Sequence, residues 1–136
     1  MIALVCGCWD HLHVGHTNFL DRVVEECEHV IVVVMDDDWI RLTKGAEPEP
    51  YATRAKAIAS RYPGAKVVSA RYPDVSAYDG VIDIIYHGPD QYWIHLPTTP
   101  RVPLAEIPRT PGVSSSAIRS GVYIPSRIHT ESEDVE

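Results

Sequence analysis

The chain has 136 residues, 45% of them hydrophobic, and its 19 acidic and 12 basic residues give a formal net charge of −7. This length suits one domain with a packed core, and the charge balance argues against a nucleic-acid surface, which needs clustered positive charge. No apolar segment approaches the roughly 20 residues of a membrane-spanning helix, and the first residues do not resemble a secretory signal, so we expect a cytoplasmic protein without membrane insertion.

The first third of the chain alternates apolar runs with an amphipathic segment. Residues 2–5 predict a parallel strand that is buried on both faces. From about residue 15, apolar side chains recur at helical spacing and predict a helix ending near residue 28. Residues 30–35 are a β-branched run and predict a second buried strand. Strand, helix and strand in this order form a βαβ unit, whose ligands gather beyond the carboxyl ends of the strands.

The middle of the chain continues the alternation. Residues 39–51 contain Lys44, Gly45 and two prolines, a composition typical of a functional loop. Thr53 predicts the N-cap of a helix running to about residue 61. We expect the apolar face of this helix to comprise Ala52, Ala57 and Ile58.

Three further strands are expected, at residues 66–70, 81–86 and 104–107, and residues 72–79 predict a loop with at most one helical turn. Together the elements predict an α/β fold. The expected architecture is a Rossmann-like, doubly wound parallel sheet of about five strands in a single domain covering residues 1–124.

The end of the chain differs in composition. Residues 114–120 predict a helix start with serine caps, and residues 125–136 predict an acidic, disordered tail. Four acids fall in that tail, and without those four acids the net charge of the chain is −3. The odd number of cysteines, at positions 6, 8 and 27, predicts reduced thiols and no disulfide framework.

Two histidines stand at the start of the first predicted helix. His13 and His16 are three positions apart, so their side chains can converge at the helix N-terminus, where free amides and the helix dipole favour an anion. Gly15 between them lets a phosphate approach the backbone. We interpret this stretch as a phosphate-binding turn whose imidazoles stabilise charge during phosphoryl transfer. Two alternatives are that the histidines only cap the helix, and that His11 joins them in a metal site.

A second basic and hydroxyl-rich stretch occurs near the other end of the chain. Arg109 and Arg119 can hold phosphate bidentately, and the three serines at 114–116 offer hydroxyls and amides at a helix start. This stretch would clamp a triphosphate from the side opposite the histidines. The alternative is a serine-capped surface helix with solvated arginines.

Both stretches resemble signatures of one nucleotidyltransferase superfamily. Residues 7–16, GCWDHLHVGH, resemble its Gly-x-Phe-Asp-x-Leu-His-x-Gly-His motif, with Trp9 at the aromatic position. Residues 109–119, RTPGVSSSAIR, resemble its Arg-Thr-x-Gly-Ile-Ser-Ser/Thr-Thr-x-Ile motif. The form is most similar to glycerol-3-phosphate cytidylyltransferases and their relatives for choline and ethanolamine phosphates. Lys44, Arg61-Tyr62 and Asp90 also stand where that branch has lysine, Arg-Tyr and Gly-Asp-Asp.

The resemblance implies transfer of CMP from CTP to a small phosphorylated alcohol or sugar, with release of pyrophosphate, Mg²⁺ as cofactor and a homodimeric assembly. The alternatives are an adenylyltransferase that uses ATP and a non-catalytic nucleotide-binding module. The catalytic residues would be His13, His16, Lys44 and Arg109, and Asp10 would also hold the metal. The nucleotide would be bound by Gly7, Cys8, Trp9, Asp10, Gly15, Asp90, Thr110, Gly112, Ser114, Ser115, Ser116 and Arg119.

Overall fold

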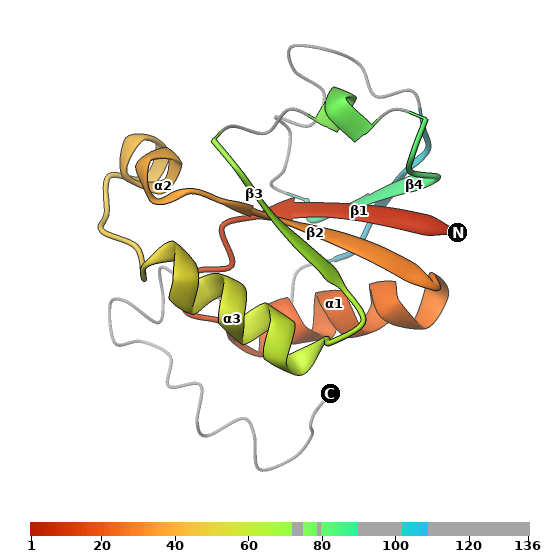
Figure 1. Cartoon of the computed structure of the whole chain (residues 1–136), viewed down its shortest axis with the longest axis horizontal. Helices are drawn as coiled ribbons and strands as arrows, with labels where there is room; N and C mark the ends of the chain where they lie inside the picture. Colours follow the sequence, from red (N-terminus) through yellow and green to blue (C-terminus); the bar gives the residue numbers. More distant parts are fainter. Residues whose placement is uncertain (72–74, 79, 90–101, 109–136) are drawn as a thin grey trace.

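The computed structural model of the protein describes residues 1–71, 75–78, 80–89 and 102–108. Five parallel strands form one sheet in the order β3-β2-β1-β4-β5 (Figure 1). The chain builds the sheet outward from β1 to β3 and then returns to the other side of β1, which is the doubly wound topology predicted from the sequence. The strands are β1 (Ile2–Gly7), β2 (His29–Met35), β3 (Lys66–Ala70), β4 (Ile84–His87) and β5 (Leu104–Glu106).

The N-terminal strand is the centre of the sheet. β1 pairs with β2 along its whole length, from Ile2 opposite His29 to Gly7 opposite Val34, and it pairs with β4 on its other edge. Residues 3–5 have no exposed surface, because the sheet is covered on both faces. A continuous apolar run therefore marks this strand, as expected for a parallel strand buried on both sides.

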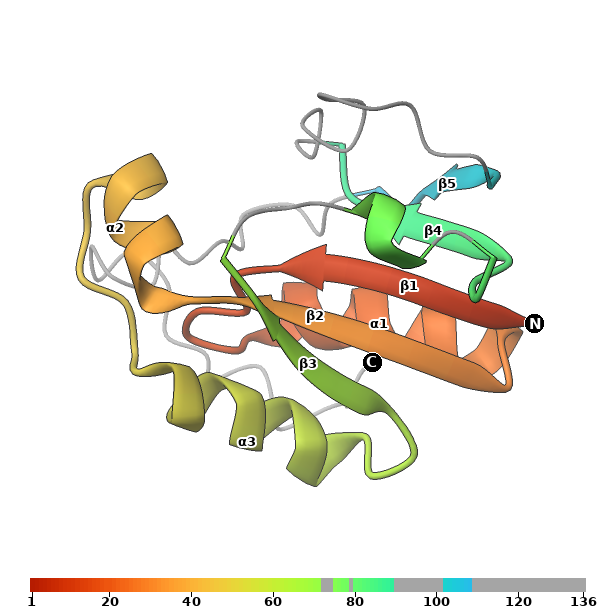
Figure 2. The same ribbon diagram turned by 45° about the horizontal axis from the view of Figure 1, so that its top comes forward.

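Two helices cover one face of the sheet. Helix α1 (Val14–Glu26) and helix α3 (Tyr51–Arg61) lie side by side beneath it (Figure 2). Leu20 and Val23 of α1 and Ile58 of α3 join the buried cluster on this face. The short 3₁₀ helix η1 (Val75–Tyr78) lies on the other side of the sheet and confirms the single helical turn expected between residues 72 and 79.

The prediction of a loop at residues 39–51 is wrong for residues 39–44, which belong to helix α2 (Asp37–Lys44). The Asp36 side chain accepts a hydrogen bond from the Trp39 amide at 2.9 Å and caps the helix start. Gly45 ends the helix in the left-handed conformation, with φ of 63°, and Ile40 is fully buried beneath it. Capping and one anchoring side chain thus outweigh the loop-like composition.

The start of α3 also differs from the prediction. The helix begins at Tyr51, two residues before the predicted N-cap Thr53, and follows Pro50, which makes no side-chain capping bond. Its buried residues are Arg54 and Ile58, four positions apart, whereas Ala52 is exposed. The buried face of α3 therefore differs from the predicted one. Ile58 is buried as expected, but the other buried residue is Arg54, which the prediction did not include.

The fourth strand is shorter than predicted and begins at Ile84. Asp83 ends the preceding segment by bonding to the start of β1, where its carboxylate accepts a hydrogen bond from the Ile2 amide at 2.7 Å. Cys6, Cys8 and Cys27 form no disulfide in this structure. Among the described residues, no helix is both long and apolar enough to cross a membrane.

Candidate active site

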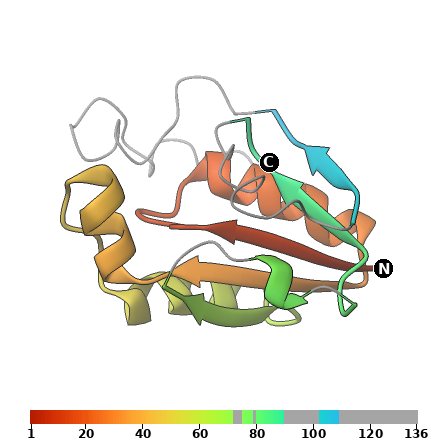
Figure 3. The same ribbon diagram turned by 90° about the horizontal axis from the view of Figure 1, so that it is seen from above.

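The candidate site lies at the carboxyl edge of the sheet. The strands all point toward the end of the molecule where α2 lies, and the turn from β1 into α1 is at the same end (Figure 3). β1 stands between β2 and β4, where the direction in which the sheet is built reverses. Ligands of open α/β sheets bind in the crevice at such a position.

The structure brings the two histidines together. The rings of His13 and His16 are stacked, with centroids 3.8 Å apart and planes 14° from parallel. His13 is the N-cap of α1 and is buried. The convergence predicted from their spacing is therefore present, and the capping role considered as its alternative is present as well.

The caps determine which ring nitrogens can donate. Nδ1 of His13 accepts hydrogen bonds from the amides of Gly15 at 3.0 Å and His16 at 3.4 Å, and Nδ1 of His16 accepts one from the His13 amide at 3.3 Å. In a neutral imidazole whose Nδ1 accepts, the proton is on Nε2. Both rings therefore carry their donor on Nε2. The Gly15 and His16 amides, expected to bind phosphate directly, donate to the His13 ring in this structure.

The environment keeps both histidines neutral. Burial and the nearby His11 lower the pKa of His13 to about 4. Burial, His13 and the positive charge of Lys44 lower the pKa of His16 well below its usual 6.5. At neutral pH the pair can therefore donate two hydrogen bonds without carrying charge itself.

Trp9 supports the histidine pair and is part of the core. Its indole Nε1 donates to the Val33 carbonyl at 3.0 Å, and its ring meets His16 edge-on with centroids 5.5 Å apart. Gly7 leaves room for the indole, because a Cβ atom at this position would lie 3.0 Å from Trp9 Cε2. Trp9 and Gly7, predicted to bind nucleotide, thus pack against each other behind the pair.

Three potential metal ligands gather beside this turn. Asp10, His11 and Glu49 each offer one ligand atom, and these atoms all lie within 4.8 Å of one another. Asp10 is buried, and its Oδ1 accepts a hydrogen bond from the Glu49 amide at 2.9 Å. Two carboxylates suit Mg²⁺, which prefers oxygen ligands and binds proteins through one or two carboxylates plus substrate phosphates. The sequence left open a metal site formed by His11 together with His13 and His16. Among the described residues, His11 instead groups with two carboxylates.

The backbone around Asp10 has an unusual conformation. Trp9 and His11 have φ angles of 53° and 51°, in the left-handed region that non-glycine residues rarely adopt. The His11 amide donates to the Glu49 carboxylate at 2.7 Å, which holds this turn against the segment before α3. Contacts between distant segments thus maintain a conformation that local preference disfavours.

Lys44 is the last residue of α2 and not part of a loop. Helix α2 lies at the same end of the sheet as the turn that carries the histidine pair. The positive charge of Lys44 contributes to the lowered pKa of His16. Arg41 stabilises this end of the helix through ion pairs of 2.8 Å with both Asp38 and Glu47.

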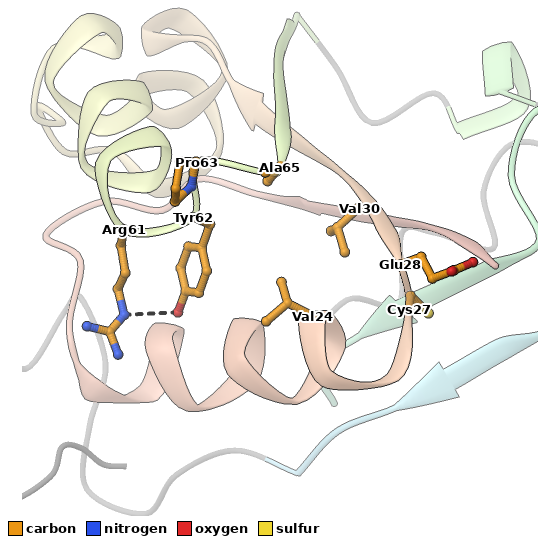
Figure 4. Close-up of a pocket in the computed structure, with 9 residues that line it drawn as sticks. Val24, Cys27, Glu28, Val30, Arg61, Tyr62, Pro63 and Ala65 are labelled. Carbon is orange, nitrogen blue, oxygen red and sulfur yellow. Dashed lines mark hydrogen bonds between the residues drawn. The ribbon is translucent and has the colours of Figure 1, made fainter.

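Arg61 and Tyr62 join the end of α3 to α1. The Tyr62 hydroxyl donates to the Asp21 carboxylate at 2.6 Å, and Arg61 pairs with the same carboxylate at 3.4 Å. They line a hollow of about 270 Å³ near the starts of β2 and β3, at the opposite edge of the sheet (Figure 4). The chemistry places the candidate site at the carboxyl edge instead.

Sequence reasoning missed Glu49 and Arg54. Arg54 is almost completely buried, and its guanidinium bonds to four segments at the carboxyl edge of the sheet. A charged residue in a helix is normally expected on the solvent side, so hydrophobic periodicity gives no signal for it. The predicted site residues Asp90, Arg109, Thr110, Gly112, Ser114, Ser115, Ser116 and Arg119, and the predicted tail, lie outside the described residues.

Comparison with known proteins finds relatives of this chain. The chain is 35% identical over 104 residues to the FAD synthase of Thermococcus kodakarensis, which covers 67% of this chain and 64% of that protein. It is 38% identical over 61 residues to the bifunctional protein HldE of Halorhodospira halophila, which covers 43% of this chain and 13% of that protein. The chain thus spans less than two thirds of the length of these curated relatives.

Solved structures share the fold. The lipopolysaccharide core biosynthesis protein of Thermoplasma volcanium superposes with a TM-score of 0.66 at 23% identity, over 81% of this chain and 98% of that chain. A protein of unknown function from Archaeoglobus fulgidus superposes with a TM-score of 0.67 at 16% identity, over 79% and 89% of the two chains. The sequence matches the family model described as cytidylyltransferase-like over residues 4–121. The chain belongs to this cytidylyltransferase-like family of nucleotidyltransferases.

Proposed function

We propose that the protein transfers a nucleotidyl group from a nucleoside triphosphate to the phosphate of a small acceptor and releases pyrophosphate. The observation that carries the proposal is the stacked histidine pair, whose Nδ1 atoms accept backbone hydrogen bonds and leave the donor of each ring on Nε2. The pair lies at the carboxyl edge of the sheet, at the same end as helix α2. Membership of the cytidylyltransferase-like family supports this chemistry.

The reaction needs positioning and charge stabilisation more than proton transfer. A phosphorylated acceptor is already anionic at neutral pH, so its oxygen can attack the α-phosphorus without a dedicated general base. The new O–P bond forms as the bond from the α-phosphorus to the bridging oxygen breaks, and the electron pair leaves with pyrophosphate. His13 and His16 donate hydrogen bonds to the phosphate oxygens, and Lys44 offsets the charge that develops on them.

Mg²⁺ is the cofactor that fits the donor set described above. Asp10 and Glu49 would hold it, and it would supply positive charge that offsets the charge of the nucleotide phosphates. Arg109, Ser115, Ser116 and Arg119 remain the proposed second half of the phosphate site. Removing divalent cations with EDTA should abolish pyrophosphate release, and adding back Mg²⁺ should restore it.

Two nucleoside triphosphates have support as the source of the nucleotidyl group. The form of the second sequence motif favours CTP, with CMP transferred to a phosphorylated alcohol or sugar. The FAD synthase relatives favour ATP, because FAD contains an adenylyl group joined to a flavin phosphate. Calorimetric competition between CTP and ATP for the purified protein would decide between them, because the true donor binds more tightly and displaces the other.

A screen of phosphorylated acceptors against CTP and ATP, with pyrophosphate as the readout, tests the proposed reaction. We expect release only when one acceptor and one nucleotide are both present. The acceptor set should include glycerol 3-phosphate, sugar phosphates and FMN. Nucleotide binding without pyrophosphate release for any acceptor would favour the non-catalytic binding module.

Variants of His16 connect the reaction to the site. His16→Ala should abolish turnover while the fold is retained. His16→Glu keeps an acceptor for the His13 amide, as glutamate does in a capping box, but its charge repels phosphate, so it should also be inactive. His29→Ala is the matched control, since His29 is exposed at the start of β2. Unchanged turnover in His16→Ala would rule out the assigned role.

We further propose a homodimer, which is the assembly that the motif resemblance implies. Sedimentation equilibrium should then give a mass twice the 15.2 kDa of the chain. A mass equal to that of one chain at micromolar concentration would reject the dimer without affecting the proposed chemistry.

A further inference from the structure

Arg54 is a buried cation in the first half of α3, and 1% of its surface is exposed. Its Nε donates to the Glu49 carbonyl at 2.8 Å, and its Nη1 donates to the carbonyls of Cys8 and Met35, each at 2.7 Å. Its Nη2 pairs with the Asp37 carboxylate at 2.5 Å. A buried charge is costly unless it is paired and hydrogen-bonded, and here every nitrogen of the guanidinium has a partner.

The four partners belong to four segments at the carboxyl edge of the sheet. Cys8 follows β1, Met35 ends β2, Asp37 opens α2, and Glu49 precedes α3. Arg54 is therefore the point at which the turn, the adjacent strand end and helix α2 are joined.

Three of these segments carry the proposed chemistry. Cys8 begins the turn that leads to His13, and the Glu49 amide and carboxylate bind the same turn at Asp10 and His11. Helix α2, which Asp37 opens, ends at Lys44. The position of Lys44 relative to the histidines thus depends on a rigid helix whose first turn is fixed by Arg54.

We infer that Arg54 is a positioning residue, which sets the placement of Lys44 relative to the His13–His16 pair through its bonds to Cys8 and Asp37. This inference rests on the proposed function, because it assigns Arg54 a part in the same phosphate site. Arginine suits the position because its planar, permanently charged fork can bind several acceptors at once, whereas lysine offers a single donor group.

The inference predicts coupling between Arg54 and Lys44 in nucleotide affinity. In the otherwise unchanged protein, Lys44→Ala should weaken nucleotide binding by roughly tenfold, as expected for the loss of a charged phosphate contact. In the Arg54→Lys background the same substitution should weaken it by less than about twofold, because Lys44 is already misplaced. Calorimetric titration of the four proteins with nucleotide gives the double-mutant cycle.

A purely structural role for Arg54 gives a different result. In that case the two substitutions act independently, their fold-changes multiply, and the inference is overturned. Arg22→Lys is the matched control, because Arg22 is exposed on α1. In that background Lys44→Ala should keep its full effect on affinity.

Asp37→Asn provides a second variant if Arg54→Lys does not fold. Asp37 is 29% exposed, and asparagine keeps an acceptor for Arg54 while removing the charge. Asp37→Asn should therefore reduce the effect of Lys44→Ala in the same direction. Independent effects in this pair would also overturn the inference.

Hydrogen exchange of the nucleotide-free protein separates failure of the inference from failure of the proposed function. In Asp37→Asn and Arg54→Lys, amides at residues 8–11 and 37–44 should exchange faster together while those of β1 and β2 stay protected. A uniform increase along the chain would show general destabilisation and would overturn the positioning role. If the unaltered protein binds no nucleotide, the proposed function fails, and this exchange pattern still decides whether Arg54 links the two segments.

Discussion

His13 is a neutral imidazole that caps a helix, and this has a consequence for stability. Its pKa is about 4 in the folded protein and near 6.5 when it is unfolded and exposed to water. As the pH falls from 6.5 to 4, the unfolded chain takes up a proton that the folded protein does not, so the folded state loses stability. The loss should approach about 3 kcal/mol and level off below pH 4.

Urea unfolding at pH 7, 5.5 and 4.5 measures this effect. His13→Asn keeps a side-chain acceptor at the N-cap but removes the titrating group, so the free energy of unfolding should change less with pH than in the unaltered protein. Equal pH dependence in the two proteins would show that His13 is not the source.

Gly7 is required by its contact with Trp9. Gly7→Ala would place a methyl group 3.0 Å from the indole and displace the ring on which His16 rests. We expect a loss of about 1–3 kcal/mol in the free energy of unfolding, the usual cost of overpacking a core. Gly64→Ala is the control, since nothing lies within 4 Å of its added methyl group. Equal unfolding midpoints for the two variants would contradict this account.

The residues that sequence reasoning found and missed differ in the range of their contacts. The pairing of His13 and His16 follows from three-residue spacing in a helix. Arg54 bonds to Cys8 across 46 positions, and the Glu49 amide bonds to Asp10 across 39. No local pattern reports such contacts, since they exist only once the sheet has brought its strand ends together.

Helix α2 shows how one buried side chain can stabilise a short element. Ile40 is fully buried, and Leu42, two positions later, is 83% exposed. Ile40→Ala should lower the free energy of unfolding by about 2–5 kcal/mol, because it leaves a cavity, whereas Leu42→Ala should change it by less than about 0.5 kcal/mol. Chemical denaturation of both variants tests this, and similar losses would mean that α2 is not anchored as described.

The helices and strands predicted correctly were those whose apolar residues recur at a regular spacing or form a continuous run. The strand at residues 66–70 is confirmed at both ends, and the first helix is confirmed within about two residues. Helix α2 was missed because its sequence, DDWIRLTK, has only one fully buried position and borders a proline-containing loop. The start of α3 was misplaced because Pro50 opens the helix without a capping side chain.

The sheet as a whole should show graded protection from hydrogen exchange. β1 is paired on both edges and β2 lies between β1 and β3, whereas β5 has three residues and pairs with β4 in the described part of the chain. Amides of β1 and β2 should therefore exchange only through global unfolding, and those of β5 should exchange through smaller openings. Mass spectrometry of peptic fragments measures this, and earlier exchange in β1 than in β5 would contradict it.

The overall topology was accessible from the sequence because five apolar runs and an intervening amphipathic helix limit the possible arrangements. The apolar pattern does not determine the order of the strands, since the fourth strand could pair with the third or with the first. The contacts that decide it are long-range. Asp83 bonds to Ile2 through both its amide and its carboxylate, across 81 positions.

The central place of β1 also affects how the protein is made. Strand β1 gains its second neighbour only when residues 84–85 have been synthesised. Until then one edge of a strand with no charged side chain is open to pairing with other chains. The proposed phosphate site also includes residues 109–119, so a nascent chain should acquire nucleotide affinity only late in synthesis.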